Sequence, residues 1–133
     1  MLLNRAARQV SREFDDALAA AGGSRSIWLV LLALTINAEA NQRELAEFVG
    51  IRGATLTHHL NTMEEAGLVV RARDPGNRRS HVIRRTPAGD DLFLRLREAA
   101  TGFDNRLRAG LSTTDVQTLT ELLGKLSDNA ARR

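Results

Sequence analysis

The stretch from residue 42 to 85 constrains the fold most, because two short amphipathic segments are followed at once by a basic hairpin pattern. Residues 42–48 and 53–66 both repeat apolar side chains at helical spacing, and the glycine between them predicts a tight turn. Two β-prone runs, residues 69–73 and 81–85, then flank a seven-residue basic tip. This order predicts a helix-turn-helix followed by a β-wing.

Further helices are expected on both sides of this stretch. Residues 2–21 space their apolar side chains as one face of a helix. Residues 27–34 are apolar all round, which is typical of a helix in the middle of a core. Residues 87–130 carry two more helical stripes, the second beginning at Ser112. The predicted fold class is therefore mainly α with a small β-wing, a winged helix-turn-helix framed by long terminal helices.

The length of 133 residues fits a single domain. We expect a winged lobe over about residues 24–86 and outer helices over about 2–21 and 87–130. The apolar stripes of the outer helices exceed what so small a lobe can cover. The sequence therefore predicts a homodimer that buries them.

The composition excludes several classes of protein. There is no cysteine, so disulfides, thiolate metal sites and thiol redox chemistry are ruled out. The first residues lack the pattern of a signal peptide, and the longest apolar run is far too short for a membrane span, so we expect a cytoplasmic protein without a membrane partner. A glycine-rich phosphate loop and a nucleophile-base constellation are also missing, which predicts neither an enzyme nor a cofactor.

The positive charge is concentrated in one segment. The formal net charge is only +3, but residues 52–85 contain seven arginines against three acids. A helix fits the major groove of duplex DNA, and an arginine-bearing ribbon can enter the minor groove beside it. We therefore expect double-stranded DNA as the partner. The predicted contacts are Arg52, Thr55, Thr57, His58 and Asn61 on the second helix, and Arg78 and Arg79 on the wing.

The adjacent histidines His58 and His59 raise the question of a metal site. Consecutive residues of a helix point about 100° apart and cannot chelate one ion together. The sequence offers no further histidine or carboxylate at a supporting spacing, so no metal is expected.

Several motifs together resemble the MarR-type winged helix-turn-helix regulators. The central signature runs from Glu-Leu-Ala at residues 44–46 to Gly-Leu-Val at 67–69, and it is shared by several winged-helix families. More specific are the wing, with Asp74-Pro75 and Arg79, and the Thr-Pro-Ala-Gly sequence at 86–89 that opens a long helix. The order and length of the helices fit this family over nearly the whole chain.

This resemblance implies a repressor that binds a pseudo-palindromic operator as a homodimer and is released by a small-molecule ligand. Residues 53–66 would be the recognition helix, and Arg79 would enter the minor groove. Phe14 and Trp28 would line an effector pocket, although Trp28 inside its apolar run is also a candidate for plain core.

Two positions depart from the family pattern. Asn77 stands where the family usually has Asp, and Arg85 stands where it usually has Leu. Both changes add positive charge, so we expect phosphate contact to be kept while the wing is held less rigidly.

Alternative interpretations stay open at this point. Thr57-His58-His59-Leu60 followed by Ala-Gly-Leu-Val also suits an ArsR-type regulator. A winged-helix module used only for protein contacts is a third class, but such a module needs no arginine-rich tip. The operator, the effector and the choice between repression and activation cannot be deduced from the sequence.

Overall fold

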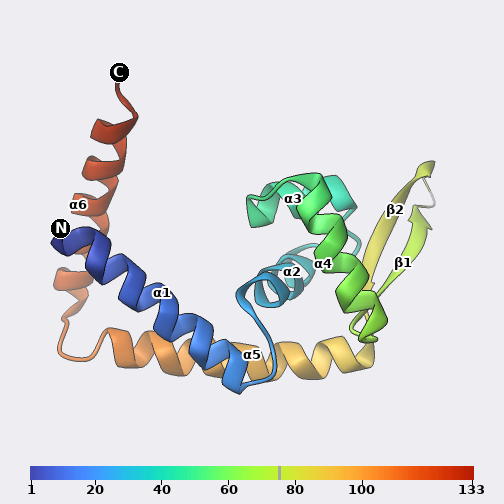
Figure 1. Cartoon of the computed structure of the whole chain (residues 1–133), viewed down its shortest axis with the longest axis horizontal. Helices are drawn as coiled ribbons and strands as arrows, with labels where there is room; N and C mark the ends of the chain where they lie inside the picture. Colours follow the sequence, from blue (N-terminus) through green and yellow to red (C-terminus); the bar gives the residue numbers. More distant parts are fainter. Residues whose placement is uncertain (75) are drawn as a thin grey trace. The chain divides into compact units, whose positions relative to one another are not determined.

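The computed structural model describes the chain except Pro75, and of residues 77–80 it describes the backbone only. The described elements are α1 (Leu2–Ala20), α2 (Arg25–Ile36), α3 (Gln42–Val49), α4 (Gly53–Glu65), β1 (Val69–Asp74), β2 (Asn77–Arg85), α5 (Pro87–Leu107) and α6 (Thr113–Ala131) (Figure 1). They form two compact units, Met1–Thr101 and Gly102–Arg133. The predicted fold class, mainly α with a small wing, is confirmed.

Local capping explains where several helices begin. At the start of α3, Asn41 Oδ1 accepts a hydrogen bond from the backbone N–H of Glu44 at 2.8 Å, and the Glu44 carboxylate accepts one from the N–H of Asn41 at 3.2 Å. This is the reciprocal capping box expected from the sequence. As predicted, Ser24 caps α2 by accepting a hydrogen bond from the N–H of Ile27, and Ser112 caps α6 in a second capping box with Asp115. Gly50 ends α3 in the left-handed conformation, at φ +76°.

The core of the first unit is apolar and draws on every helix of that unit and on the wing. The apolar helix α2 lies in its middle, as predicted, and it is surrounded by α3, α4, the base of the hairpin and the first turns of α5 (Figure 1). The fully buried large side chains are Leu18, Val30, Leu31, Leu34, Leu45, Leu56, Leu60, Met63, Val69, Ile83 and Leu96.

The wing is an antiparallel hairpin whose tip is tighter than the sequence predicted. Strand pairing runs out to Asp74 and Asn77, so the expectation of a seven-residue tip was wrong. The Asp74 carboxylate accepts a hydrogen bond from the N–H of Gly76 at 2.9 Å, a side-chain turn that closes the chain locally. The register shifts between Arg73 and Asp74.

The base of the wing is fixed to the segment that precedes α3. The N–H of Ile83 donates to the carbonyl of Ala40 at 3.0 Å, and an isolated β-bridge pairs Asn41 with Val82. Because Val82 and Ile83 are both buried, β2 is attached by backbone and by side chains. The wing therefore starts from a rigid point on the helix-turn-helix.

The second unit contains the end of α5 and the whole of α6. Gly110 turns the chain between them at φ +83°. Among the described residues of α6 none is buried, and its large apolar side chains are 43–52% exposed: Leu119, Leu122, Leu123 and Leu126.

Within the described residues, no single helix has the length and apolar character needed to cross a membrane. The pair α1 and α2 meets that test only in combination, and the two helices are bent by 76° at their junction.

Candidate nucleic-acid interface

Helix α4 has two distinct faces. Leu56, Leu60 and Met63, at helical spacing, are at most 1% exposed and pack into the core. On the opposite face Thr55, His58 and Asn61, spaced by three residues, are all exposed. The buried face holds the helix in place, so the polar face is presented on a fixed support.

The beginning of α4 is open and positively charged. Arg52 is the N-cap residue, its side chain is exposed, and it makes no capping hydrogen bond. The first backbone N–H groups of a helix point outward and carry the positive end of its dipole, which favours anions. An exposed guanidinium beside them adds a full positive charge.

The predicted contact Thr57 lies deeper than its neighbours. It is half-buried, its hydroxyl donates to the Gly53 carbonyl at 2.9 Å, and it accepts a hydrogen bond from the Gln42 side chain. Thr57 therefore joins α3 to α4 inside the helix-turn-helix. Its contact with DNA stays a prediction.

The wing lies beside α4, and a side-chain hydrogen bond joins the two elements. Arg71 of β1 donates from Nη2 to Asn61 Oδ1 of α4 at 2.9 Å. This places Asn61 next to the hairpin, and Figure 1 shows β1 running beside α4. The side chains of Arg78, Arg79 and Asn77 lie outside the described residues, so their predicted roles stay predictions.

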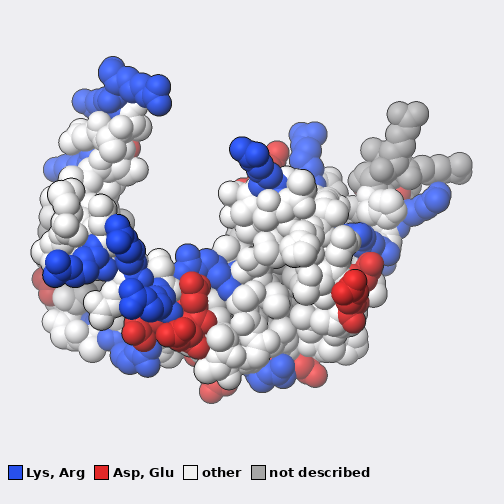
Figure 2. All heavy atoms as spheres, viewed as in Figure 1, with Lys and Arg blue, Asp and Glu red and all other residues white. Residues whose placement is uncertain are grey.

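Charge is distributed unevenly over this region. Figure 2 shows basic side chains over the wing and above the α3–α4 pair, with acidic ones near the far end of α4. The exposed residues Glu64 and Glu65 belong to that acidic end, whereas Arg52 lies at the beginning of the helix. A polyanion would be attracted to the beginning of α4 and to the wing.

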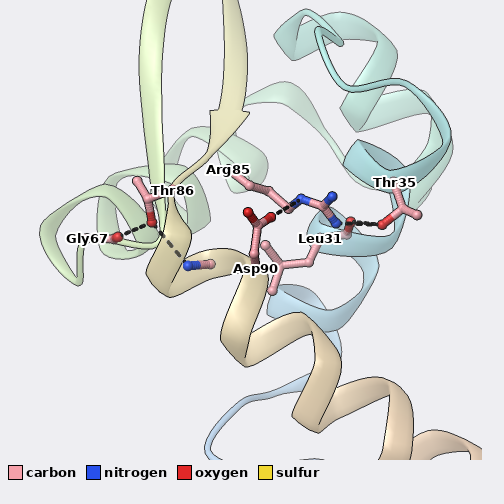
Figure 3. Close-up of polar contacts among 7 residues, drawn as sticks. Leu31, Thr35, Gly67, Arg85, Thr86 and Asp90 are labelled. Carbon is pink, nitrogen blue, oxygen red and sulfur yellow. Dashed lines mark hydrogen bonds and ion pairs between the residues drawn. The ribbon is translucent and has the colours of Figure 1, made fainter.

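Arg85 is half-buried and its partners are internal, which corrects our expectation that this residue leaves the wing less rigidly held. Its Nη1 donates to the Thr35 hydroxyl of α2 at 2.7 Å, and its Nε lies 2.9 Å from Asp90 Oδ1 of α5 (Figure 3). The Thr35 hydroxyl in turn donates to the Leu31 carbonyl at 3.0 Å. The guanidinium also lies 5.1 Å from the ring centroid of Phe93. Arg85 therefore ties the end of the wing to two helices, and it restrains the wing rather than loosening it.

Thr86 makes the adjoining link between the wing and α5 (Figure 3). Its hydroxyl accepts a hydrogen bond from the N–H of Gly89 at 3.1 Å, which caps α5, and donates one to the carbonyl of Gly67. The N–H of Thr86 donates to the Leu68 carbonyl at 3.1 Å. The turn that ends α4 and the start of α5 are therefore held together.

The two candidate pocket residues pack against the core. Trp28 stacks on Phe93, with ring centroids 5.5 Å apart and an interplanar angle of 10°. Phe14 lies under the guanidinium of Arg25, 5.9 Å from its ring centroid. Both are partly buried against the core, which favours the core interpretation of Trp28; their role in an effector pocket stays a prediction.

In the part of the chain that the structure describes, there is no group of three or more His, Asp or Glu side chains that could hold a metal ion. What the described site offers is hydrogen-bonding groups and positive charge on a rigid support.

The helix-turn-helix, with its exposed second helix and its attached hairpin, defines a winged helix-turn-helix protein. Residues 24–80 match the model of the MarR family. The structure superimposes on the transcriptional repressor CouR bound to a 23-mer DNA duplex with a TM-score of 0.83 and 31% identity, covering 95% of this chain and 89% of that one. The chain therefore belongs to the MarR family.

Two further comparisons also cover most of this chain. CouR from Rhodococcus jostii RHA1 bound to p-coumaroyl-CoA is 28% identical, with a TM-score of 0.79 and coverage of 94% of this chain and 88% of that one. A putative transcriptional regulatory protein for the hcr operon of Thauera aromatica is 29% identical over 105 residues, 79% of this chain. The chain spans 63% of the length of that relative, just under two thirds.

Proposed function

We propose that this protein is a sequence-specific DNA-binding regulator of transcription. Helix α4 would lie in the major groove with Arg52, Thr55, His58 and Asn61 toward bases and phosphates, and the wing would reach the neighbouring minor groove. The hydrogen bond between Arg71 and Asn61 carries this proposal, because it joins the polar face of α4 to the wing. Because such a protein acts on DNA, we propose that it is located in the cytoplasm. We also propose that its activity is DNA binding rather than catalysis.

We propose further that it works as a homodimer. In the second unit the leucines of α6 are about half exposed, and in the first unit Leu3 and Val10 of α1 are 49% and 36% exposed. Apolar surface of this extent on helical faces is typical of an interface. In this proposal residues 24–86 are the DNA-binding lobe, and residues 2–21 and 87–130 dimerise. Two-fold symmetry would then set two half-sites about one helical turn of DNA apart.

Repression and release by a small ligand are proposed from the relatives. CouR is described as a repressor bound to DNA, and in another structure it is bound to p-coumaroyl-CoA. We infer that this chain also represses, and that a small molecule weakens its hold on the operator.

The direct test is selection of binding sites from a pool of random duplex DNA, followed by gel shift with the selected sequence. We expect an inverted repeat with half-sites about ten base pairs apart, centre to centre. The triple variant T55A/H58A/N61A is altered only on the exposed face of α4, so it should keep its fold. It should lose the sequence preference, which would show that this face is the source of the preference. Failure of the wild type to enrich any sequence would contradict the proposal and favour a module for protein contacts.

A further inference from the structure

Arg71 and Asn61 meet across two elements that the core holds in place. Arg71 lies on β1 opposite Ile83, which is fully buried, and Asn61 follows the fully buried Leu60 on α4. The 2.9 Å hydrogen bond from Arg71 Nη2 to Asn61 Oδ1 is therefore formed between two fixed supports. Asn61 is exposed, whereas Arg71 is half-buried.

The chemistry of the pair decides which way the Asn61 amide faces. A guanidinium has only donors, so the group that meets it must be the amide oxygen and not the amide NH2. The NH2 group of Asn61 is then left on the other side of the amide. An asparagine without such a neighbour can turn its amide either way, so Arg71 removes one of two orientations.

Arg71 is poorly placed to contact DNA itself through Nε. That nitrogen is buried and has no hydrogen-bond partner among the described residues. An arginine that binds phosphate presents its donors to solvent. The neighbouring Arg73 on the same strand is exposed and makes the natural comparison.

We propose that Arg71 is a positioning residue for base reading: it fixes Asn61 so that the amide NH2 faces the duplex as a donor. This inference rests on the proposed function of α4 as the recognition helix. A fixed NH2 donor can hydrogen-bond to guanine, adenine or thymine, because these bases present the acceptors N7, O6 or O4 in the major groove. It cannot bond to a cytosine on the strand that it faces, because cytosine presents only its own N4 donor there. Asn61 then reads one position of each half-site as "not cytosine".

The test compares the wild type with R71M, N61A and the double variant by selection from random duplex DNA and by titration of the selected site. The wild type should disfavour cytosine at one position by about tenfold, and R71M should reduce this to about twofold, because the freed amide can turn its oxygen to the cytosine N4. N61A should lose the same preference, and the double variant should equal N61A. R73M, the matched control, should keep the preference.

Salt dependence separates positioning from phosphate contact. Loss of one phosphate contact lowers the slope of log affinity against log salt by about one. R71M should leave the slope unchanged. A slope lowered by about one in R71M, or an unchanged cytosine preference, would overturn the proposal.

A measurement on the free protein tests the contact without DNA. In spectra of 15N-labelled protein, R71M should shift the side-chain NH2 resonances of Asn61, while R73M should not, and circular dichroism should show both variants folded. Unshifted Asn61 resonances in R71M would overturn the positioning role. If the wild type selects no sequence but R71M still shifts the Asn61 resonances, the proposed function is overturned, and the base-reading role of Asn61 with it. The contact between Arg71 and Asn61 would then still be established.

Discussion

Gly89 is the position where a single methyl group should cost most. A Cβ placed there would lie 2.1 Å from the Leu68 carbonyl oxygen and 3.2 Å from its carbonyl carbon. The first distance is more than 1 Å shorter than van der Waals contact, and the opposing atom is backbone, which cannot rotate away. The variant G89A must therefore separate the start of α5 from the turn after α4.

The magnitude follows from three contributions. Overpacking of a closed site costs about 1–3 kcal/mol. Loss of the hydrogen bond from the Thr86 N–H to the Leu68 carbonyl, now 3.1 Å, costs about 1 kcal/mol. Alanine returns about 1 kcal/mol through its higher helix propensity. We expect G89A to lower the free energy of unfolding by about 2 kcal/mol.

The matched control is G102A in the same helix. A Cβ at Gly102 meets no atom within 4 Å among the described residues. The same substitution should there raise the free energy of unfolding by about 0.5–1 kcal/mol. Urea unfolding followed by circular dichroism, at one fixed protein concentration, measures both variants. A midpoint of G89A equal to or above that of the wild type would refute the steric argument.

Three further predictions concern the wing, its base and the terminal helices. R79A should weaken binding to most duplexes and lower the salt slope of affinity by about one, measured by titration at several salt concentrations; an unchanged slope would show that Arg79 does not neutralise a phosphate. R85L should lower the free energy of unfolding by about 1–2 kcal/mol, because a charged hydrogen bond to Thr35 and a cation–π contact are lost while the partly exposed ion pair adds little; urea unfolding as stable as the wild type would count against this. L122D should shift the protein from dimer to monomer in sedimentation at micromolar concentration, since it places a charge on the 52% exposed Leu122; a wild type that sediments as a monomer would remove the dimer from the proposal.

Local signals made most of the fold predictable. The capping box of Asn41 and Glu44, the caps at Ser24 and Ser112 and the spacing of leucines on α4 all act within one or two turns of the chain. Interactions of this range can be deduced from residue order alone. The helix expected over residues 53–66 is observed as α4, Gly53–Glu65, which differs from the expectation by one residue.

Contacts between distant residues could not be deduced in this way. Arg85 meets Thr35 fifty residues away, so its basic character suggested phosphate contact when its real partners are internal. Arg71 and Asn61 are ten residues apart and meet only because the turn after α4 folds β1 back beside the helix. The sequence marked Asn61 as a reader but gave no sign of the arginine that orients it.

The division of α4 into a buried and an exposed face also bears on how such a protein can change over generations. Leu56, Leu60 and Met63 are at most 1% exposed and pack α4 against the core, whereas Thr55 and His58 on the opposite face are exposed and do not contribute to this packing. If α4 reads DNA as proposed, exchanges at these two outward positions redirect the protein to new promoters with little penalty to folding. Under the proposed function, a gene duplicate changed at both positions would acquire a new regulon while its scaffold stays the same.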